Sequence, residues 1–389
     1  MASPQRTYRT ALIGCGRMGR NHALALANTP GVELAALADV DQASLDRMGD
    51  DVGVDRGRRY LGHEALLDAE QLDFVVIATQ APQHAATVAA AAARGVHVLC
   101  EKPLALELAE ADALVAACER AGVRLAINHL RRVSRVAQTA RDMVADGAIG
   151  DVIGIEVHEK GGRPVGNTLM EMSCHDFDLA RFVVSRWPSG SGRPADDVEW
   201  VYARLVTGLG AAAHPARRDE VVPSLATVPS DRDCGLVVGD RGLVVLGLGC
   251  EVQAVARFVN RPSPDSAYDG VDVIGTQGSL LVRGGSDIAL FRRRGHAWAA
   301  HDHHEPVEVG ELWARPGESA AVAHCRAMAL ELVAAIEEGR EHVSSGRDGL
   351  AALEAIMAVY ESHKAGGPVA LPLADRHHPL ASWREAVPA

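Results

Sequence analysis

The sequence predicts an α/β fold, with a doubly wound parallel sheet first and a second, α+β domain behind it. Up to residue 128, short apolar runs alternate with helical stretches of about 10 to 16 residues, as in a parallel sheet whose strands are joined by helices. Beyond residue 150 the apolar runs are longer and mostly lack a following helix, which favours antiparallel pairing.

Length and composition limit the class of protein. At 389 residues the chain is too long for one ordinary core, so we expect two domains, residues 1–128 and 129–389. The net charge of −12, without a basic block, argues against nucleic acid or an anionic membrane as partner. No apolar run approaches the length of a membrane span, and the first residues lack the apolar core of a signal peptide, so we expect a cytoplasmic protein. The seven scattered cysteines predict reduced thiols and no zinc site.

The stretch 9–39 carries the pattern of a dinucleotide-binding unit. An apolar run at 11–13 is followed by Gly14, Gly16 and Gly19, a helical run, a second apolar run at 34–38 and then Asp39. In such a unit the glycines permit a tight turn, close approach of a pyrophosphate and packing of helix on strand. The helix N-terminus attracts the phosphates, and the acid accepts hydrogen bonds from the adenine ribose.

The acid also bears on the choice of cofactor. Asp39 is followed by Val40 and Asp41, with no basic side chain beside it. A 2′-phosphate would meet two carboxylates there, so NAD is favoured over NADP. The alternative is that Asp39 caps the next helix, expected at 42–48.

Further buried strands are expected at 74–79, 96–100 and 123–128, with helices at 84–94 and 106–121. Ligands of such sheets bind beyond the carboxyl ends of the strands. The residues at or just after those ends are Asp39, Thr79, Lys102 and Asn128, so we expect the site there.

The chain contains the motifs GCGRMGRNH at 14–22, AT-x-x-x-x-H at 78–84 and EKPLA at 101–105. Together they resemble the glucose-fructose oxidoreductase/inositol dehydrogenase/rhizopine catabolism (Gfo/Idh/MocA) family. Residues 147–150, His175 with Asp178, and the glycine turn at 274–278 fit as well. The resemblance covers most of residues 8–185. It implies a Rossmann domain and then a substrate-binding domain with a large open, mostly antiparallel sheet. The flat face of that sheet implies a homodimer or homotetramer.

The resemblance also implies roles for single residues. Lys102 would steady the developing alkoxide and His175 would be the general acid/base, with Glu171 one helical turn before it as its partner. The cofactor contacts implied are Gly14, Gly16, Arg17, Met18, Gly19, Asp39, Thr79, His84, Glu101, Lys102 and Asn128. The substrate contacts implied are Lys102, Arg131, Arg132, Lys160, Asn167 and His175.

Each of these roles has a plainer alternative. Lys102 can be an exposed lysine paired with Glu101, and His175 a core histidine bonded to Asp178. The arginines at 131 and 132 can form a solvated start of the helix expected at 133–145. The family usually has Asp where Glu171 stands and often Gly where Ser173 stands, so the chain departs from the family pattern beside His175.

We therefore expect an NAD-dependent oxidoreductase acting on a secondary alcohol or ketone of a sugar, inositol-like polyol or sugar derivative. One alternative is a glycoside-cleaving relative that oxidises, eliminates and reduces again with tightly held NAD. An alternative of another class is a non-catalytic dinucleotide sensor. The histidines at 296, 301, 303 and 304, and His377 with His378 near the C-terminus, are expected to be solvated, with no metal.

Overall fold

The structure is a computed structural model that describes residues 6–158, 169–170, 173–188, 194–208, 210–224, 235–249, 251–259, 269–283, 289–294, 304–309, 315 and 317–385. The chain falls into two compact units. Unit 1 comprises Met1–Val133 and Trp313–Leu350, and unit 2 comprises Ser134–Leu312 and Ala351–Ala389. The expected boundary after residue 128 lies near the first change of unit. Residues 313–350, which the sequence analysis places in the second domain, cluster with unit 1.

Unit 1 is built on a six-stranded sheet in the order β3-β2-β1-β4-β5-β6. All neighbouring strands in it are parallel. The order reverses between β1 and β4, the point at which open α/β sheets bind their ligands. This confirms the predicted doubly wound sheet. The strands are Tyr8–Ile13 (β1), Val32–Asp39 (β2), Arg59–Leu61 (β3), Phe74–Ile77 (β4), His97–Cys100 (β5) and Leu125–Ile127 (β6).

Some helix ends of unit 1 lie at residues that satisfy terminal backbone groups. The carboxylate of Asp41 accepts a hydrogen bond from the N–H of Ser44 at 3.0 Å and so caps α2. Helices α2 and α5 end at Gly53 and Gly122, both in the left-handed region that glycine adopts without strain. The helices that link the strands are Arg17–Ala27 (α1), Gln42–Val52 (α2), His63–Ala69 (α3), His84–Ala93 (α4) and Leu108–Ala121 (α5).

Helix α9 (Ala320–Glu338) belongs to unit 1 although it lies far along the chain. It packs against α1. Its buried Met328 and Leu332 share one core cluster with Leu12, Leu37 and Phe74 from the sheet. An apolar helix can pack against any face whose apolar side chains it buries. The position of α9 in the sequence therefore did not reveal which element it packs against.

Unit 2 holds a ten-stranded sheet, in which nine strands follow the order β17-β16-β15-β14-β7-β13-β12-β8-β18 and β9 pairs with β8. Strands β7 and β13 run parallel, and the other described neighbours run antiparallel. The predicted mostly antiparallel sheet is thus confirmed. Its strands are Val152–His158 (β7), Val198–Thr207 (β8), His214–Pro215 (β9), Arg241–Leu248 (β12), Gln253–Val259 (β13), Gly270–Gly275 (β14), Gly278–Arg283 (β15), Ala289–Arg294 (β16), His304–Pro306 (β17) and Val369–Ala370 (β18). A separate pair is formed by Val222–Pro223 (β10) and Leu236–Val237 (β11).

Two long apolar runs that suggest single strands are hairpins. The run 242–258 contains β12 and β13, which turn where Glu251 adopts a φ of 63°. The run 272–282 contains β14 and β15, whose turn begins at Gly275. A Cβ at Gly275 would lie 2.2 Å from the carbonyl oxygen of Ile149, so glycine is required there. Apolar residues continue through both turns, which hides them in the sequence.

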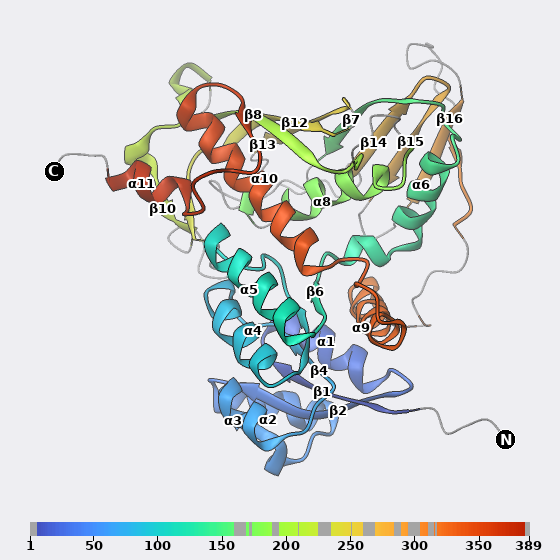
Figure 1. The fold of residues 1–389 in the computed structure, drawn as a ribbon, viewed down its shortest axis with the longest axis vertical. Helices are drawn as coiled ribbons and strands as arrows, with labels where there is room; N and C mark the ends of the chain where they lie inside the picture. The colour runs from blue at the N-terminus through green and yellow to red at the C-terminus, as the bar shows by residue number, and fades with distance from the viewer. Residues whose placement is uncertain are drawn as a thin grey trace. The chain divides into compact units, whose positions relative to one another are not determined.

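Helices α6 (Arg135–Ala145) and α8 (Ser173–Val184) cover one face of this sheet (Figure 1). Helix α6 packs on β15 and β16, and α8 packs on β7 and β14. The remaining helices are α10 (Gly346–Ala365), which begins in unit 1 and continues in unit 2, and α11 (Pro379–Glu385). Among the described residues, no helix is both long and apolar enough to span a bilayer.

Candidate functional site

The glycine turn after β1 combines two glycines that the fold requires with one that it does not. Gly14 has a φ of +103°, and a Cβ there would lie 2.6 Å from the carbonyl carbon of Ala78. A Cβ at Gly19 would lie 2.0 Å from the carbonyl oxygen of Gly14. A Cβ at Gly16 would meet nothing within 4 Å. The fold therefore leaves open space beside Gly16, as approach of a pyrophosphate demands.

A cavity of about 470 Å³ lies in unit 1 and is lined by Gly14, Gly16, Asp39 and Thr79, four of the predicted cofactor residues. Ser44 and Gln80 also line it. Arg17 and Met18 form the first turn of α1, whose leading N–H groups have no partner within the helix. The cavity thus combines a glycine turn and a helix start, which suits a dinucleotide phosphate.

Asp39 is held in place by backbone groups. Its Oδ2 accepts a hydrogen bond from the N–H of Cys15 at 2.5 Å, and its Oδ1 accepts one from the N–H of Asp41 at 2.9 Å. The cap of α2 is Asp41, so the alternative that Asp39 caps this helix is wrong. Val40, between the two acids, is 89% exposed and lines the cavity. The backbone therefore fixes the orientation of the Asp39 carboxylate.

His84 joins two loops near this cavity. Its ring is fully buried, with Nδ1 2.8 Å from the carbonyl oxygen of Pro103 and Nε2 3.2 Å from that of Thr79. The Oγ1 of Thr79 is buried and has no hydrogen-bond partner among the described residues. Thr79 therefore keeps a polar group for a ligand, whereas His84 orders the loops.

Glu101 and Asn128 meet in a buried network that also contains His22. The Oε1 of Glu101 lies 3.0 Å from His22 Nε2 and accepts a hydrogen bond from Asn128 Nδ2 at 2.8 Å. Cys325 of α9 places its Sγ 3.8 Å from the same His22 nitrogen. Burial alone would lower the pKa of His22, but the contacts with Cys325 and Glu101 outweigh it and raise that pKa. His22 is not among the residues predicted for the site, although it ends the motif GCGRMGRNH and lies on the buried side of α1.

Lys102 is only 6% exposed. The alternative for Lys102 was an exposed lysine paired with Glu101. Its exposure is wrong, because the Lys102 side chain, directly after β5, is buried. Burial of an ammonium requires polar partners, so this lysine has a defined environment.

The two arginines after β6 differ. Arg132 is 4% exposed, donates from Nη1 to the carbonyl oxygen of Val343 at 3.0 Å and lies 2.9 Å from Asp348 Oδ1. It is not a solvated helix start, and these contacts tie it to the fold of unit 1. Arg131 is half-buried. Burial and then the charge of Arg131 lower the pKa of His324 in α9 to about 4.

In unit 2, His175 lies in the first turn of α8 and is half-buried. Asp178, one turn further, is buried with an oxygen 3.9 Å from Arg181 Nη1. The predicted partner Glu171, and the predicted substrate residues Lys160 and Asn167, lie outside the described residues. The roles of these residues stay predictions.

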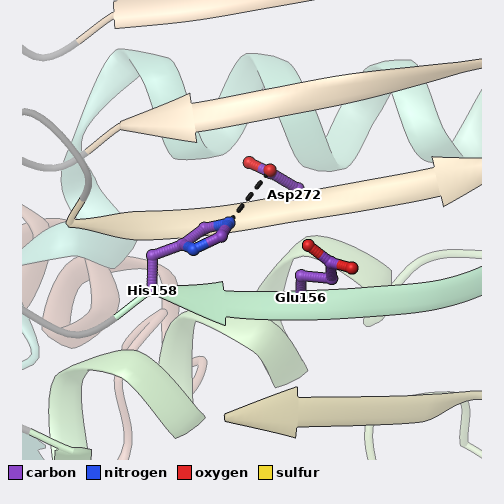
Figure 2. Close-up of side chains that lie close together, drawn as sticks. All are labelled: Glu156, His158 and Asp272. Atoms are coloured by element: carbon purple, nitrogen blue, oxygen red, sulfur yellow. Dashed lines mark hydrogen bonds and ion pairs between the residues drawn. The ribbon is translucent and has the colours of Figure 1, made fainter. Parts of the chain in front are cut away.

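A cluster of possible metal ligands lies on the sheet of unit 2. Figure 2 shows Glu156, His158 and Asp272 on one face, with ligand atoms within 4.8 Å of one another. His158 Nε2 lies 2.9 Å from Asp272 Oδ2, and Arg283 binds the other oxygen of Asp272. Burial raises the pKa of Asp272, but these hydrogen bonds outweigh it and hold the pKa below its usual range. The contacts identify an ion-pair cluster.

The other histidines divide between described and undescribed parts of the chain. His296, His301 and His303 lie outside the described residues, and only the backbone of His304 is described, in β17. His378 is 4% exposed, with its ring centroid 5.7 Å from that of Tyr360, so the expectation that it is solvated is wrong. Burial, and then Lys364, lowers the pKa of His378 to about 4.

Comparison with known proteins identifies the family. A family model described as an oxidoreductase family with an NAD-binding Rossmann fold matches residues 8–129. D-apiose dehydrogenase from Paraburkholderia graminis is 30% identical over 377 residues, which cover 94% of this chain and 90% of that protein. The chain belongs to the Gfo/Idh/MocA oxidoreductase family.

Other members of the Gfo/Idh/MocA family match over nearly the whole chain. Inositol 2-dehydrogenase from Rhizobium meliloti is 25% identical over 363 residues, covering 89% of this chain and 94% of that protein. The solved structure of levoglucosan dehydrogenase with NADH and levoglucosan has a TM-score of 0.74 at 19% identity and covers 95% of this chain and 100% of that one. That likeness shows a shared fold. Membership confirms the predicted resemblance and makes the protein an oxidoreductase.

Proposed function

We propose that the protein transfers a hydride between NAD and a secondary alcohol or ketone of a sugar, inositol-like polyol or sugar derivative. The observation that carries this is the cavity in unit 1, where Gly16 leaves open space and Asp39 is held by backbone hydrogen bonds. Membership of the family supports the reaction type, and relatives named apiose and inositol dehydrogenases support the substrate class.

NAD is the proposed cofactor in preference to NADP. Asp39 and Asp41 place two carboxylates at the carboxyl end of β2, and both Asp39 oxygens are oriented by N–H donors. A 2′-phosphate would meet these charges, whereas ribose hydroxyls can donate to them. We expect Asp39→Ser to lower kcat/KM with NAD by about tenfold or more. The ratio of kcat/KM with NAD to kcat/KM with NADP should fall as a result. Equal use of both cofactors by the unaltered protein would contradict the proposal.

Lys102 and His175 are the proposed catalytic residues, with Glu171 as the partner of His175. NAD, when bound, supplies the hydride acceptor at its nicotinamide ring. The ammonium of Lys102 holds the substrate oxygen and stabilises the charge that develops on it. The imidazole of His175 takes the hydroxyl proton during oxidation and returns it during reduction. Arg131, Lys160 and Asn167 are proposed to bind further hydroxyls, and Arg132 to position this region.

The test is NADH formation over a panel of sugars and polyols. We expect Lys102→Met and His175→Ala each to lower kcat by at least about 100-fold while NAD still binds, since each removes one partner of the reacting oxygen. Arg186→Gln, an exposed change in unit 2, is the control. Release of an aglycone without NADH would favour the glycoside-cleaving alternative. NAD binding with no turnover on any substrate would favour the sensor.

A homodimer or homotetramer in the cytoplasm is part of this proposal. It draws on the open sheet that the family resemblance implies and on the ten-stranded sheet of unit 2. Light scattering of the purified protein decides the oligomeric state, and a monomer would contradict that part alone.

A further inference from the structure

The buried network around His22 lies at three adjoining strand ends of unit 1. The N–H of Glu101 donates to the carbonyl oxygen of Ile77 at 2.8 Å, and the N–H of Asn128 donates to that of Cys100 at 2.7 Å. The backbone of the network is therefore part of the sheet. His22 reaches it from α1, and both His22 and Glu101 are at most 2% exposed.

This arrangement orients the amide of Asn128. Because Oε1 of Glu101 accepts from Asn128 Nδ2, the amide nitrogen is committed to the carboxylate. The Oδ1 atom of Asn128 is buried and has no hydrogen-bond partner among the described residues. A buried carbonyl oxygen without a donor is costly, so it points to a ligand that donates a hydrogen bond there.

The same network anchors the chain on one side of Lys102. Glu101, the preceding residue, is held through its side chain by His22 and Asn128. On the other side, the carbonyl oxygen of Pro103 lies 2.8 Å from His84 Nδ1. Lys102 therefore projects from a turn in which both neighbouring residues are held by hydrogen bonds. At Glu101 these bonds depend in part on His22, which comes from a separate helix.

We propose that His22 is a positioning residue: through Glu101 it holds the backbone from which Lys102 projects and fixes the Asn128 amide so that its oxygen is offered as an acceptor. The proposal rests on the catalytic role proposed for Lys102. Without His22, the carboxylate loses a buried donor and must turn toward another one, which displaces both neighbours. A displacement of about 1 Å at a reacting group can lower a rate by about 100-fold.

The kinetic test compares His22→Ala, His22→Gln and His342→Ala. We expect His22→Ala to lower kcat at least about tenfold with little change in the Kd for NAD, and His22→Gln, which keeps a donor, to recover most of it. His342 is a matched control, because it is also a buried histidine beside α9, but its hydrogen bonds to described residues go to the backbone of Met328 and Ser344. Its removal should lower stability with kcat within about twofold of the starting protein.

A second measurement does not need turnover. The chain has three lysines, Lys102, Lys160 and Lys364, so lysine labelled with ¹³C at Cε gives three NMR signals, assignable with Lys160→Arg and Lys364→Arg. We expect His22→Ala and Glu101→Gln to move the Lys102 signal, His22→Gln to restore it, and His342→Ala to leave it in place.

The two proposals fail in different ways. Absence of hydride transfer by the unaltered protein on every substrate refutes the proposed function, while the NMR comparison still decides the role of His22. If the Lys102 signal and kcat are unchanged in folded His22→Ala, the positioning role is refuted. If His22→Ala does not fold, Glu101→Gln replaces it as the variant that disrupts the contact, with His22→Gln as the variant that keeps it. An unmoved Lys102 signal in folded Glu101→Gln would then refute the positioning role.

Discussion

Charged side chains gather both at the strand ends of unit 1 and on the sheet face of unit 2, but they are held differently. Glu101 in unit 1 is 2% exposed and bonds to two side chains from other elements. In unit 2, Asp272 is 20% exposed and Glu156 is exposed. Loss of a partner at the strand ends of unit 1 leaves a buried group without a hydrogen bond. On the sheet face of unit 2, water replaces a lost partner. Of these two places, the strand ends of unit 1 hold their charged side chains more firmly and are better suited to impose geometry on a ligand.

The largest effect that tests this contrast is expected at the glycine turn. In Gly19→Ala the new Cβ would overlap the carbonyl oxygen of Gly14 at 2.0 Å. Backbone must move, so we expect a loss of more than about 3 kcal/mol in the free energy of unfolding. Urea denaturation measures it.

The matched control is Gly16→Ala, where the Cβ meets open space. We expect a stability change below about 1 kcal/mol and a fall in NAD affinity of at least about tenfold, because the methyl group occupies the approach of the phosphates. Unaltered affinity would show that the cavity is not the dinucleotide site.

An intermediate effect is expected from pH on the core of unit 1. Burial lowers the pKa of His342 to about 4. In the unfolded chain it returns to about 6.5, so the unfolded state binds more protons between these values. The contribution of His342 to stability is fully present above about pH 6.5. It is lost as the pH falls through about 4, which lowers the free energy of unfolding by up to about 3 kcal/mol. Denaturation across pH should show a flatter slope for His342→Gln, and parallel slopes would contradict the assignment.

The smallest effect is expected on the sheet of unit 2. Asp272→Asn should lower the free energy of unfolding by about 1 kcal/mol or less. The ion pairs of Asp272 with His158 and Arg283 are partly exposed, so water can take the place of the lost contacts. Glu156 lies directly opposite Asp272 in the register of β7 and β14, so Glu156→Gln removes a like-charge contact. We expect a gain of a few tenths of a kcal/mol, and a large loss in either variant would mean that this face is also rigid.

Local patterns in the sequence were sufficient to predict the residues that line the proposed cofactor cavity. Strand, glycine turn, helix and acid follow one another within residues 9–39, and the structure places Gly14, Gly16 and Asp39 around one cavity. Thr79 joins them because parallel strands end at a common edge. Each of these inferences used neighbouring residues or the rule for strand ends.

Features that depend on contacts between residues far apart in the sequence could not be predicted from it. His378 is buried against Tyr360, and nothing in its polar surroundings indicates that contact. Arg132 is committed to Val343 and Asp348, more than 200 residues later. The partners of His22 directly follow β5 and β6 or belong to α9, so the three-dimensional structure was needed to bring them together.

The return of residues 313–350 to unit 1 has a consequence for synthesis of the chain. Met328 and Leu332 of α9 belong to the core formed with Leu12 and Phe74, so the first 133 residues emerge from the ribosome with an apolar surface still uncovered. All of unit 2 up to residue 312 must be translated before that surface is closed. A nascent chain halted in between would therefore be a substrate for chaperones, even though every residue of its cofactor cavity has already been made.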